Sequence, residues 1–365
     1  MSSSDILYSK ITSEQDFKNR IVMAPMTRSR ATEDHIPTPI MAAYYGERAS
    51  AGLLITEGTS PSPNGVGYAR IPGIYNDQQI DAWRAVTKAV HANGGKIFLQ
   101  IMHTGRVSHP DNMPNNAKIV APSAIAPENT KMWVDGKGEL EIPVPNEMSS
   151  SDIEQVIEEF VQAAQNAIAA DFDGVEIHGA NGYLLEQFFN PASNKREDEY
   201  GGSVENRSKV ILEIAKRTVA AIGADRVGVR LSPNGVMNDV GPWESQKQDF
   251  EYLVSQFNSL NLLYLHLLDH QAMGANPLPE DIRTSLQSKF DGINILCGGY
   301  DKSTAIKDLT NEKADMIAFG RPFVANPDLV ERFKQDADLN EVDQDTLYTP
   351  GKEGYLDYPK LEPIS

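Results

Sequence analysis

The sequence has only one cysteine, Cys297, among its 365 residues, which excludes a disulfide within the chain. A lone thiol inside an apolar run indicates a buried, inert side chain and fits a reducing compartment such as the cytoplasm. Basic residues are also few, since 33 Lys and Arg stand against 51 Asp and Glu and give a formal net charge of −18. Because this average field repels phosphate backbones and anionic lipids, we predict neither nucleic acid nor a membrane as a partner.

Long hydrophobic runs are missing as well. No segment approaches the roughly 18 apolar residues of a membrane-spanning helix, and the start "MSSSDILYSKITSEQDFKNR" lacks the basic and apolar pattern of a signal peptide. A GxGxxG pattern between an early strand and its helix is also missing, which disfavours a doubly wound open sheet without excluding it. A hydrophobic content of 40% is nevertheless enough for a large core. We therefore expect a cytoplasmic globular protein.

Eight short apolar runs alternate with segments of helical periodicity. Several runs are apolar at successive positions, as expected for parallel strands covered on both faces. The runs span residues 20–25, 52–58, 96–103, 173–179, 226–233, 262–268, 293–299 and 315–321. Eight strand–helix units in about 300 residues predict an α/β fold of the (β/α)₈ barrel type. We expect residues 1–365 to form one such domain.

Two helices and two insertions stand out in this alternation. The segment "SDIEQVIEEFVQAAQNAIAA" places Ser151 and Glu154 at capping-box spacing, and the helix predicted within 77–95 ends in a glycine pair suited to a C-cap. Residues 104–148 are rich in Pro, Asn and Gly and far exceed a normal connection, so we predict an excursion over the active site. Residues 190–207 form a second polar insertion.

Polar side chains gather where the predicted strands end. These residues are Thr27, Gln100, His103, His178, Asn181, Arg230 and Arg321. In a (β/α)₈ barrel such positions converge on one mouth, although each residue alone is more often a structural hydrogen-bonding group. The loops after the seventh and eighth strands, "CGGYD" and "FGRPFVANP", place glycines before a helix. Together with Arg321 they predict a phosphate site.

Several motifs carry a family resemblance over nearly the whole chain. They are "MAPMTRSRA", "LQIMHTGRVSH", "GVEIHGANGYLLEQFFNPASNKREDEYGGSVENR", "RLSP", "CGGYD" and "AFGRPFVANPDL". The chain thereby resembles the Old Yellow Enzyme family of FMN-dependent NAD(P)H ene-reductases, which includes N-ethylmaleimide reductases. The motif that begins at 174 is highly specific, whereas the glycines near 298 and 320 occur in many phosphate-binding barrels.

The resemblance implies a cofactor, FMN, reduced by NADPH or NADH. Thr27 is expected to bind the flavin C4 carbonyl, Gln100 the pyrimidine edge, and Arg230 the N1–C2 edge, where negative charge develops. The residues expected to complete the FMN site are Pro25, Gly58, Gly298, Gly299, Gly320 and Arg321. The glycines near 298 and 320 would hold the 5′-phosphate with Arg321.

The same resemblance implies how a substrate is bound and reduced. His178 and Asn181 would donate hydrogen bonds to the carbonyl oxygen of an activated alkene, and Tyr183 would protonate the α-carbon after hydride reaches the β-carbon. Tyr68, Met102 and Tyr348 are expected to line the substrate pocket. Met102 and Gly58 stand where many relatives have Trp and Ala, which predicts a roomier pocket. Expected partners are small activated alkenes (enones, maleimides, nitro compounds), and the chain is expected to be a monomer or homodimer.

Three other functions remain open from the residues alone. A metal-dependent barrel hydrolase would also collect histidines, and the chain offers His103, His109, His178, His266 and His270, but without a His-x-His on the first strand. A phosphate-dependent lyase or isomerase would normally place a Lys or Glu base at a strand end. A passive flavin-binding protein would have no use for the proton donor Tyr183.

Overall fold

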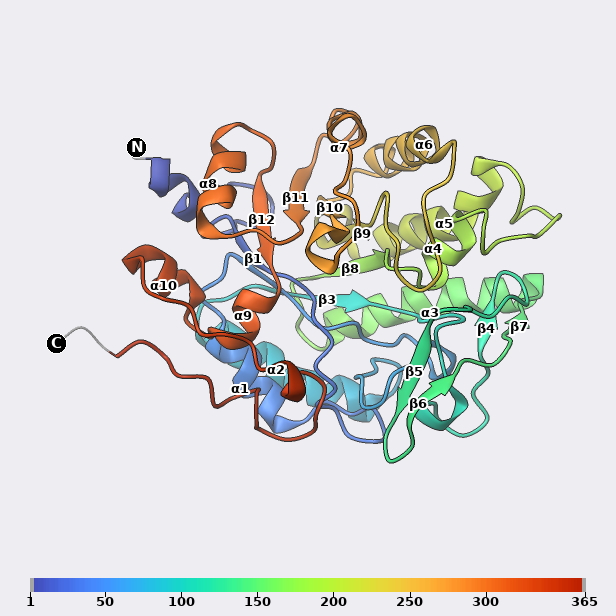
Figure 1. Ribbon diagram of the computed structural model, residues 1–365, viewed down its shortest axis with the longest axis horizontal. Coiled ribbons are helices and arrows are strands. Elements are labelled where there is room, and N and C mark those ends of the chain that lie inside the picture. Colours follow the sequence, from blue (N-terminus) through green and yellow to red (C-terminus); the bar gives the residue numbers. More distant parts are fainter. Residues whose placement is uncertain (1–2, 363–365) are drawn as a thin grey trace.

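Eight parallel strands form the closed barrel that the sequence predicts. The computed structural model describes residues 3–362 and contains no cis peptide bond among them. Around the barrel the strands follow the order β1-β12-β11-β10-β9-β8-β3-β2, and β1 pairs with both β2 and β12 (Figure 1). In the described part of the chain these strands are β1 (Ile21–Met23), β2 (Leu53–Ile55), β3 (Ile97–Ile101), β8 (Gly174–Gly179), β9 (Val227–Leu231), β10 (Tyr264–Leu268), β11 (Ile293–Cys297) and β12 (Met316–Phe319).

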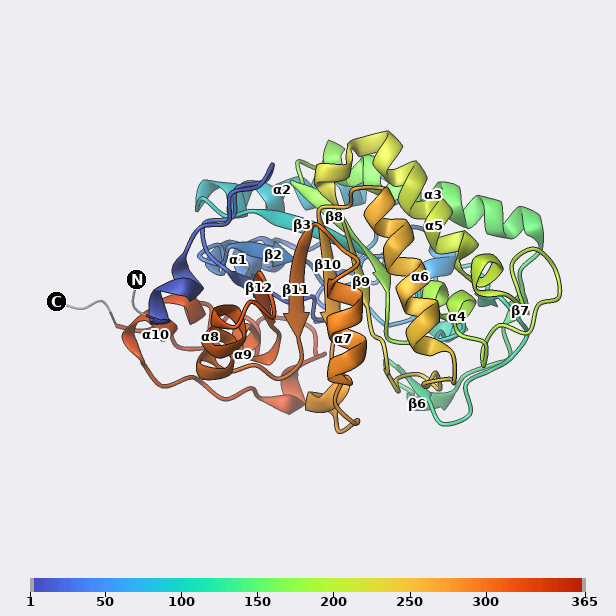
Figure 2. The same ribbon diagram turned by 90° about the horizontal axis from the view of Figure 1, so that it is seen from above.

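Helices surround the barrel and connect its strands. Across residues 3–362 the α-helices are α1 (Pro39–Glu47), α2 (Asp77–Ala92), α3 (Ser150–Ala169), α4 (Leu184–Phe189), α5 (Val204–Ile222), α6 (Gln246–Ser259), α7 (Glu280–Gln287), α8 (Lys302–Thr310), α9 (Arg321–Ala325) and α10 (Leu329–Gln335). Short 3-10 turns lie at η1 (Ser3–Tyr8), η2 (Pro63–Gly65), η3 (Pro110–Asn112), η4 (Ala224–Arg226), η5 (His270–Met273) and η6 (Gln344–Thr346). From above, α5, α6 and α7 lie side by side along the strands (Figure 2). No helix in the described ranges is long and apolar enough to cross a membrane.

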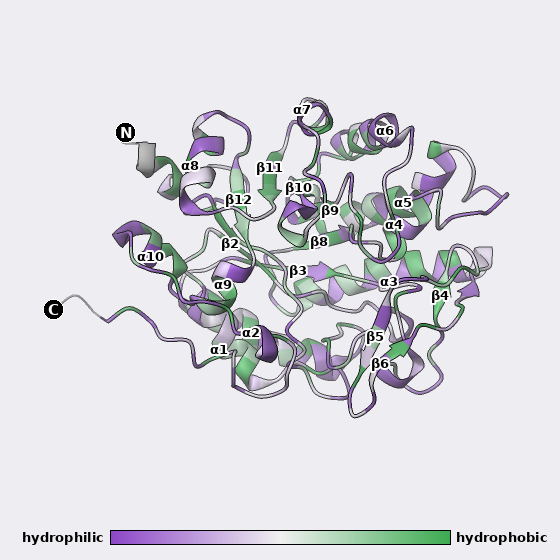
Figure 3. Ribbon diagram, in the orientation of Figure 1, coloured by the Kyte–Doolittle hydropathy of each residue, from purple (hydrophilic) through white to green (hydrophobic). Residues whose placement is uncertain are grey.

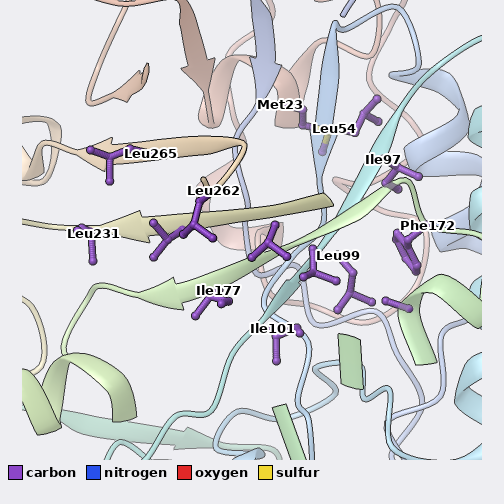
Figure 4. Packing of buried hydrophobic residues seen from close by; sticks show 14 of the residues in the cluster. Met23, Leu54, Ile97, Leu99, Ile101, Phe172, Ile177, Leu231, Leu262 and Leu265 are labelled. Carbon is purple, nitrogen blue, oxygen red and sulfur yellow. The ribbon is translucent and has the colours of Figure 1, made fainter. Parts of the chain in front are cut away.

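Side chains of each strand alternate between two hydrophobic layers. On β3, Ile97, Leu99 and Ile101 pack outward with the helices, whereas Phe98 joins a separate cluster inside the barrel. Figure 4 shows Leu99, Ile177 and Leu231 on neighbouring strands in the outer layer. In Figure 3, β11 is hydrophobic while α6 and α7 mix hydrophilic and hydrophobic residues. The helices therefore turn one apolar side to the barrel.

The inner layer is crowded enough to require a glycine. A Cβ atom on Gly228 would lie 2.1 Å from the ring of Tyr264, which is fully buried inside the barrel. Gly228 therefore leaves room for that ring, which lies 5.8 Å from the ring of Phe98 between centroids. This apolar packing closes the lower part of the barrel, and the polar side chains of Gln100, His178 and Arg230 lie nearer the carboxyl ends of their strands.

The excursion predicted at 104–148 has structure of its own. It contains β4 (Val120–Ala121) paired with β7 (Asn146–Glu147), and a hairpin of β5 (Lys131–Val134) and β6 (Gly138–Glu141), at the lower right of Figure 1. Met132 and Ile142 enter a hydrophobic cluster that includes Met102 and Tyr183. The excursion therefore packs against residues expected in the substrate pocket.

The glycine pair after α2 lies where the C-cap was predicted, but the start of α3 differs from expectation. Gly94, with φ of 68°, follows the C-cap Asn93. The prediction of Ser151 and Glu154 as the capping box of α3 is wrong: Ser149 is the N-cap and Asp152 is the third helical residue. Ser149 has an extended backbone, so its Oγ accepts the Asp152 N–H at 3.2 Å, while Asp152 accepts the Ser149 N–H at 2.8 Å.

These two serines provide a matched test of the cap. We expect Ser149→Ala to lower the free energy of unfolding by about 1 kcal/mol, because the first turn loses its acceptor. Ser151→Ala, on the exposed first turn, should change it by no more than about 0.5 kcal/mol. Urea unfolding followed by circular dichroism measures both. Equal effects of the two substitutions would contradict this assignment of the cap.

Candidate active site

A cavity of about 430 Å³ lies at the carboxyl ends of the barrel strands. Nearly all of the predicted site residues line it, although they come from distant parts of the chain. The predicted residues in its wall are Pro25, Thr27, Gly58, Gln100, Met102, His178, Asn181, Tyr183, Arg230, Gly298, Gly299, Gly320, Arg321 and Tyr348. Tyr68 is not part of this wall, and neither is His103, whose burial lowers its pKa to about 3.

The register of the strands places polar side chains at the floor of the cavity and just below it. Gln100 lies opposite Glu176 across β3 and β8, and Arg230 on β9 lies between His178 on β8 and His266 on β10. Each is an inward position, so period-two alternation directs all five side chains into the barrel. The predicted residues on distant strands therefore become neighbours.

Glu176 and His266 form a buried pair under this floor that sequence reasoning missed. Their side chains are fully buried, and His266 Nδ1 lies 2.8 Å from Glu176 Oε2. Burial raises the pKa of Glu176, but His266 outweighs it and the net pKa lies below the usual value. Burial likewise opposes the imidazolium of His266, yet Glu176 raises its pKa above the usual value. Gln100 Nε2 donates to Glu176 Oε1 at 2.8 Å, which leaves the Gln100 oxygen as the atom free to act as an acceptor.

His178 presents a neutral N–H to the cavity. The Ala180 N–H donates to His178 Nδ1 at 3.3 Å, so the ring proton belongs on Nε2. Burial lowers the pKa of His178 well below its ordinary value, and the positive charges of Arg230 and His266 add to this effect. The imidazole is therefore a neutral donor at physiological pH.

Asn181 and Tyr183 follow on the loop between β8 and α4. Asn181 has φ of 60°, a left-handed conformation that Asn tolerates better than most residues. Its N–H donates to Ser232 Oγ at 2.9 Å, and its carbonyl accepts from Asn238 Nδ2 at 2.7 Å. The backbone N–H and the carbonyl of Asn181 are thus both hydrogen-bonded, and its side chain lies in the cavity wall.

Tyr183 is a protonated phenol in an apolar setting. Its ring lies edge-on to His178 with centroids 5.1 Å apart, and its hydroxyl lies 2.9 Å from that of Tyr68. Burial raises the pKa of Tyr183 to about 12. Tyr68 therefore reaches the cavity through Tyr183 rather than as a wall, although both rings belong to one cluster.

The opposite end of the cavity is made of glycines and Arg321. Gly298 and Gly299 have φ values of 150° and 78°, and a Cβ on Gly298 would lie 2.7 Å from Asp269 Cβ. Gly320 is the N-cap residue of α9, directly before the exposed Arg321. Backbone N–H groups in such turns and an arginine suit a phosphate group.

Two buried arginines next to Thr27 hold the C-terminal segment beside the cavity. Arg28 donates to the carbonyls of Leu347 and Gly354 at 3.1 and 2.6 Å, and Arg30 donates to that of Thr346 at 2.7 Å. Leu347 and Tyr348 of this segment line the cavity. This contact could not be predicted from the sequence, because it joins residues more than 300 positions apart.

Sequence reasoning also missed much of the cavity's apolar wall. Met26, Met237 and Met273 line it together with Met102, so four flexible thioethers face the same space. Cys297 lies in the wall too, and its Sγ is 3.9 Å from Arg230 Nη2. The thiol is buried, as expected, but it contacts the site rather than an inert core.

Gly58 and Met102 do not enlarge the cavity independently. A Cβ on Gly58 would lie 2.4 Å from Met102 Sδ and 2.6 Å from Met102 Cε. The thioether therefore fills the room that the glycine leaves. The expectation that each of the two residues makes the pocket roomier needs this correction, because one compensates for the other.

Comparison with known proteins agrees with this arrangement. Residues 10–340 match the NADH:flavin oxidoreductase / NADH oxidase family. The chain is 42% identical over 356 residues to 12-oxophytodienoate reductase 1 of Oryza sativa subsp. japonica, covering 96% of this chain and 91% of that protein. It is 41% identical over 349 residues to a probable flavin mononucleotide-dependent alkene reductase of Leishmania infantum, covering 93% of each. The structure of morphinone reductase in complex with tetrahydroNAD superposes with a TM-score of 0.93 at 40% identity, covering 98% of both chains.

The chain belongs to the NADH:flavin oxidoreductase (Old Yellow Enzyme) family. The expected α/β barrel, the FMN cofactor and the NAD(P)H reductant are confirmed at the level of this family. So is the FMN-dependent reduction of activated alkenes, which makes the chain an NAD(P)H oxidoreductase. Among residues 3–362, no group of three or more His, Cys, Asp or Glu side chains is placed to hold a metal ion.

The cavity fits the FMN that Old Yellow Enzyme family members bind. Arg230 is buried, and within the described residues its Nε has no hydrogen-bond partner. A buried, unsatisfied guanidinium N–H is unfavourable unless a ligand accepts its hydrogen bond, as an anionic or carbonyl edge of a flavin would. The phosphate-type turn lies in the same cavity. One end thus suits a flavin ring edge and the other suits its phosphate.

The contact between Gly58 and Met102 can be tested by a double-mutant cycle. We expect Gly58→Ala to lower the free energy of unfolding of the holoenzyme by about 1 kcal/mol, because the new methyl displaces the thioether. In a Met102→Ala background the same change should have a smaller effect, because the thioether is gone and the Cβ of residue 102, at 3.1 Å, is the part of that side chain that remains. Gly241→Ala, where a Cβ meets no atom within 4 Å, is the control. Additive effects would show that the two positions are independent.

Proposed function

We propose that this protein reduces the C=C bond of α,β-unsaturated carbonyl compounds, with His178 and Asn181 binding the carbonyl oxygen and Tyr183 donating a proton to the α-carbon. The observation that carries this proposal is the pairing of a neutral Nε2–H donor on His178 with a protonated Tyr183 in one cavity. Relatives with such reductase names support the same reaction type. Enones and maleimides are the substrate classes that we expect, with nitro compounds as a further class.

Residues at both ends of the cavity would hold FMN. Pro25, Thr27 and Gly58 would flank the ring, and Gln100 and Arg230 would bind its polar edge. The residues that we assign to the phosphate end are Gly298, Gly299, Gly320 and Arg321. Bound FMN supplies a carrier that takes a hydride from NAD(P)H and passes a hydride to the alkene.

The carbonyl clamp follows from the chemistry of its two donors. As the β-carbon receives hydride, negative charge grows on the carbonyl oxygen, and donors already aimed at that oxygen stabilise it more strongly than they stabilise the ground state. A neutral His178 suits this role because its Nε2–H can donate a hydrogen bond to the negative oxygen while the proton stays on the ring. Asn181 adds a second N–H donor from the same loop.

Tyr183 completes the reaction by transferring its hydroxyl proton to the α-carbon. A phenol with a pKa of about 12 stays protonated at rest and can still donate to a strongly basic enolate. The contact with the Tyr68 hydroxyl, at 2.9 Å, would hold the donor in place. Met102 and Tyr348 would form walls of the substrate space.

The nicotinamide and the alkene would use the same pocket in turn. His178 and Asn181 would bind the carboxamide oxygen of NAD(P)H in the first half-reaction and the substrate carbonyl in the second. Such alternate occupancy predicts ping-pong kinetics. The choice between NADPH and NADH, a cytoplasmic location and a monomeric or homodimeric state remain predictions from the sequence.

An anaerobic visible spectrum tests the proposed reaction and its proton donor together. Flavin absorption should bleach with NADPH and return with 2-cyclohexen-1-one. Tyr183→Phe should bleach at the wild-type rate but recover about 10²-fold to 10⁴-fold more slowly, because only the second half-reaction needs the proton. Tyr75→Phe, in the same hydrophobic cluster but outside the cavity wall, should leave both rates unchanged. Absence of recovery in the wild type would refute the proposed substrate class.

The pKa of Tyr183 predicts the alkaline limb of the pH profile. A tyrosine proton donor fails as pH rises through its pKa, and burial raises that of Tyr183 from 10.0 to about 12. The rate of reoxidation by the enone should therefore stay level from about pH 8 to about pH 10, the ordinary tyrosine pKa. Stopped-flow measurement of this half-reaction provides the profile. A fall centred near pH 10 would assign the proton to a phenol with an unshifted pKa.

A further inference from the structure

A buried histidine outside the expected site contacts the side chain of Asn181. His270 lies in η5, just after β10, and is 2% exposed. Its Nε2 is 2.9 Å from Asn181 Oδ1, although 89 positions separate the two residues. His270 does not line the cavity itself. Any effect on substrate must therefore pass through Asn181.

Backbone geometry determines which ring nitrogen of His270 carries the proton. The Val236 N–H points at His270 Nδ1 over 3.1 Å, and a backbone N–H can only donate. Nδ1 is therefore the acceptor, and Nε2 carries the hydrogen. Burial lowers the pKa of His270 to about 4, with Arg230 adding to this effect and Asp269 opposing it, so the ring stays in this neutral form at physiological pH.

This tautomer in turn determines the orientation of the Asn181 amide. An Nε2–H donor requires an acceptor opposite it, and the only acceptor of the amide group is Oδ1. The NH₂ group must then lie on the other side. If the amide turned over, two donors would face each other at His270, and an oxygen would replace the donor proposed for the substrate.

The remaining contacts of Asn181 hold its backbone but not its amide. Ser232 Oγ accepts the backbone N–H, and Ser232 is itself held by Glu186, whose carboxylate oxygens lie 3.1 and 3.3 Å from that hydroxyl. Asn238 Nδ2 donates to the backbone carbonyl. Among the described residues, the hydrogen bond to the Asn181 side chain comes from His270.

The loop that supports His270 is shaped around its ring. A Cβ on Gly235 would lie 2.9 Å from His270 Cε1 and 2.8 Å from the Ser232 carbonyl oxygen. Gly235 therefore allows the loop between β9 and α6 to close on the imidazole and to deliver the Val236 N–H. Elements after two different strands thus cooperate to hold one ring nitrogen.

We propose that His270 is a positioning residue that locks the Asn181 amide with its NH₂ group toward the substrate carbonyl. This inference rests on the proposed function, because it assigns the donor half of the carbonyl clamp. Without the lock, the amide would sample both orientations and would repel the carbonyl oxygen in one of them. The lock therefore acts on carbonyl binding and leaves FMN binding unaffected.

Three substitutions separate this role from mere support of the loop. His270→Gln can place an amide N–H near the position of Nε2, where it can still donate to Asn181. His270→Asn places its polar group near Nδ1, so it can serve Val236 but does not reach Asn181. His270→Ala serves neither contact. His91→Ala, at a partly exposed histidine on α2 far from the cavity, is the control.

The readout is the dissociation constant of 2-cyclohexen-1-one for the oxidised FMN holoenzyme, measured from the change in flavin absorption. We expect the His270→Ala and His270→Asn variants to bind the enone roughly threefold to tenfold more weakly, which is the effect of losing one neutral hydrogen bond. The dissociation constant of the His270→Gln variant should remain within about twofold of the wild-type value, because this variant keeps the hydrogen bond to Asn181. FMN affinity should be unchanged in all variants, which also shows that they fold. In an Asn181→Ala background, His270→Ala should have no further effect.

Distinct results would overturn the assignment. The first such result is a His270→Asn variant that binds the enone as tightly as the wild type. The second is a His270→Gln variant that binds it as weakly as His270→Ala. Either result would show that His270 supports the loop or fills space and does not orient the amide. If the His270→Ala variant alone fails to fold, the enone affinities of His270→Gln and His270→Asn still show whether His270 orients the Asn181 amide. A wild-type holoenzyme that neither binds nor reduces the enone would refute the proposed function and this assignment with it.

Discussion

The parallel register of the closed barrel is the constraint on which the site depends. Because each strand alternates inward and outward, one polar residue at an inward position near the carboxyl end of a strand is enough to reach the centre. Gln100, His178 and Arg230 are such residues: pairing places Arg230 beside His178, and places Gln100 beside Glu176, the inward position before His178. A slip of one residue on β8 would turn His178 toward the helices and bring Ile177 into the cavity.

Gathering polar groups inside a barrel is unfavourable unless each has a partner or stays neutral. The structure uses both solutions. Glu176 and His266 are paired, and Gln100 satisfies the second carboxylate oxygen. His178 and Tyr183 instead remain uncharged, because burial disfavours the charged form of each. The same desolvation that opposes charge therefore produces a neutral donor and a protonated phenol, the two groups that the proposed reaction needs.

The loops around the mouth of the barrel determine the shape of the cavity wall above the strands. Arg28 and Arg30 tie the C-terminal segment to the loop that carries Thr27, so the two sides of the cavity form one unit. The four methionines give the wall a flexible apolar surface, and Met102 already occupies the space beside Gly58. Cavity shape thus depends on pairs of residues rather than on single positions.

Strand periodicity was enough to predict the barrel, and the motifs that carry the resemblance were enough to predict the family and many of the polar and glycine residues that line the cavity, because these are local patterns. The sequence did not reveal Glu176, Cys297 or His270 as part of the site, since an inward Glu or a lone His carries no signal until its neighbours are known. It also misplaced the cap of α3 by two residues and treated Gly58 and Met102 as independent. These points required the three-dimensional structure, because the hydrogen bond of His270 to Asn181 and the contact of Met102 with Gly58 depend on how strands and loops distant in sequence meet in space.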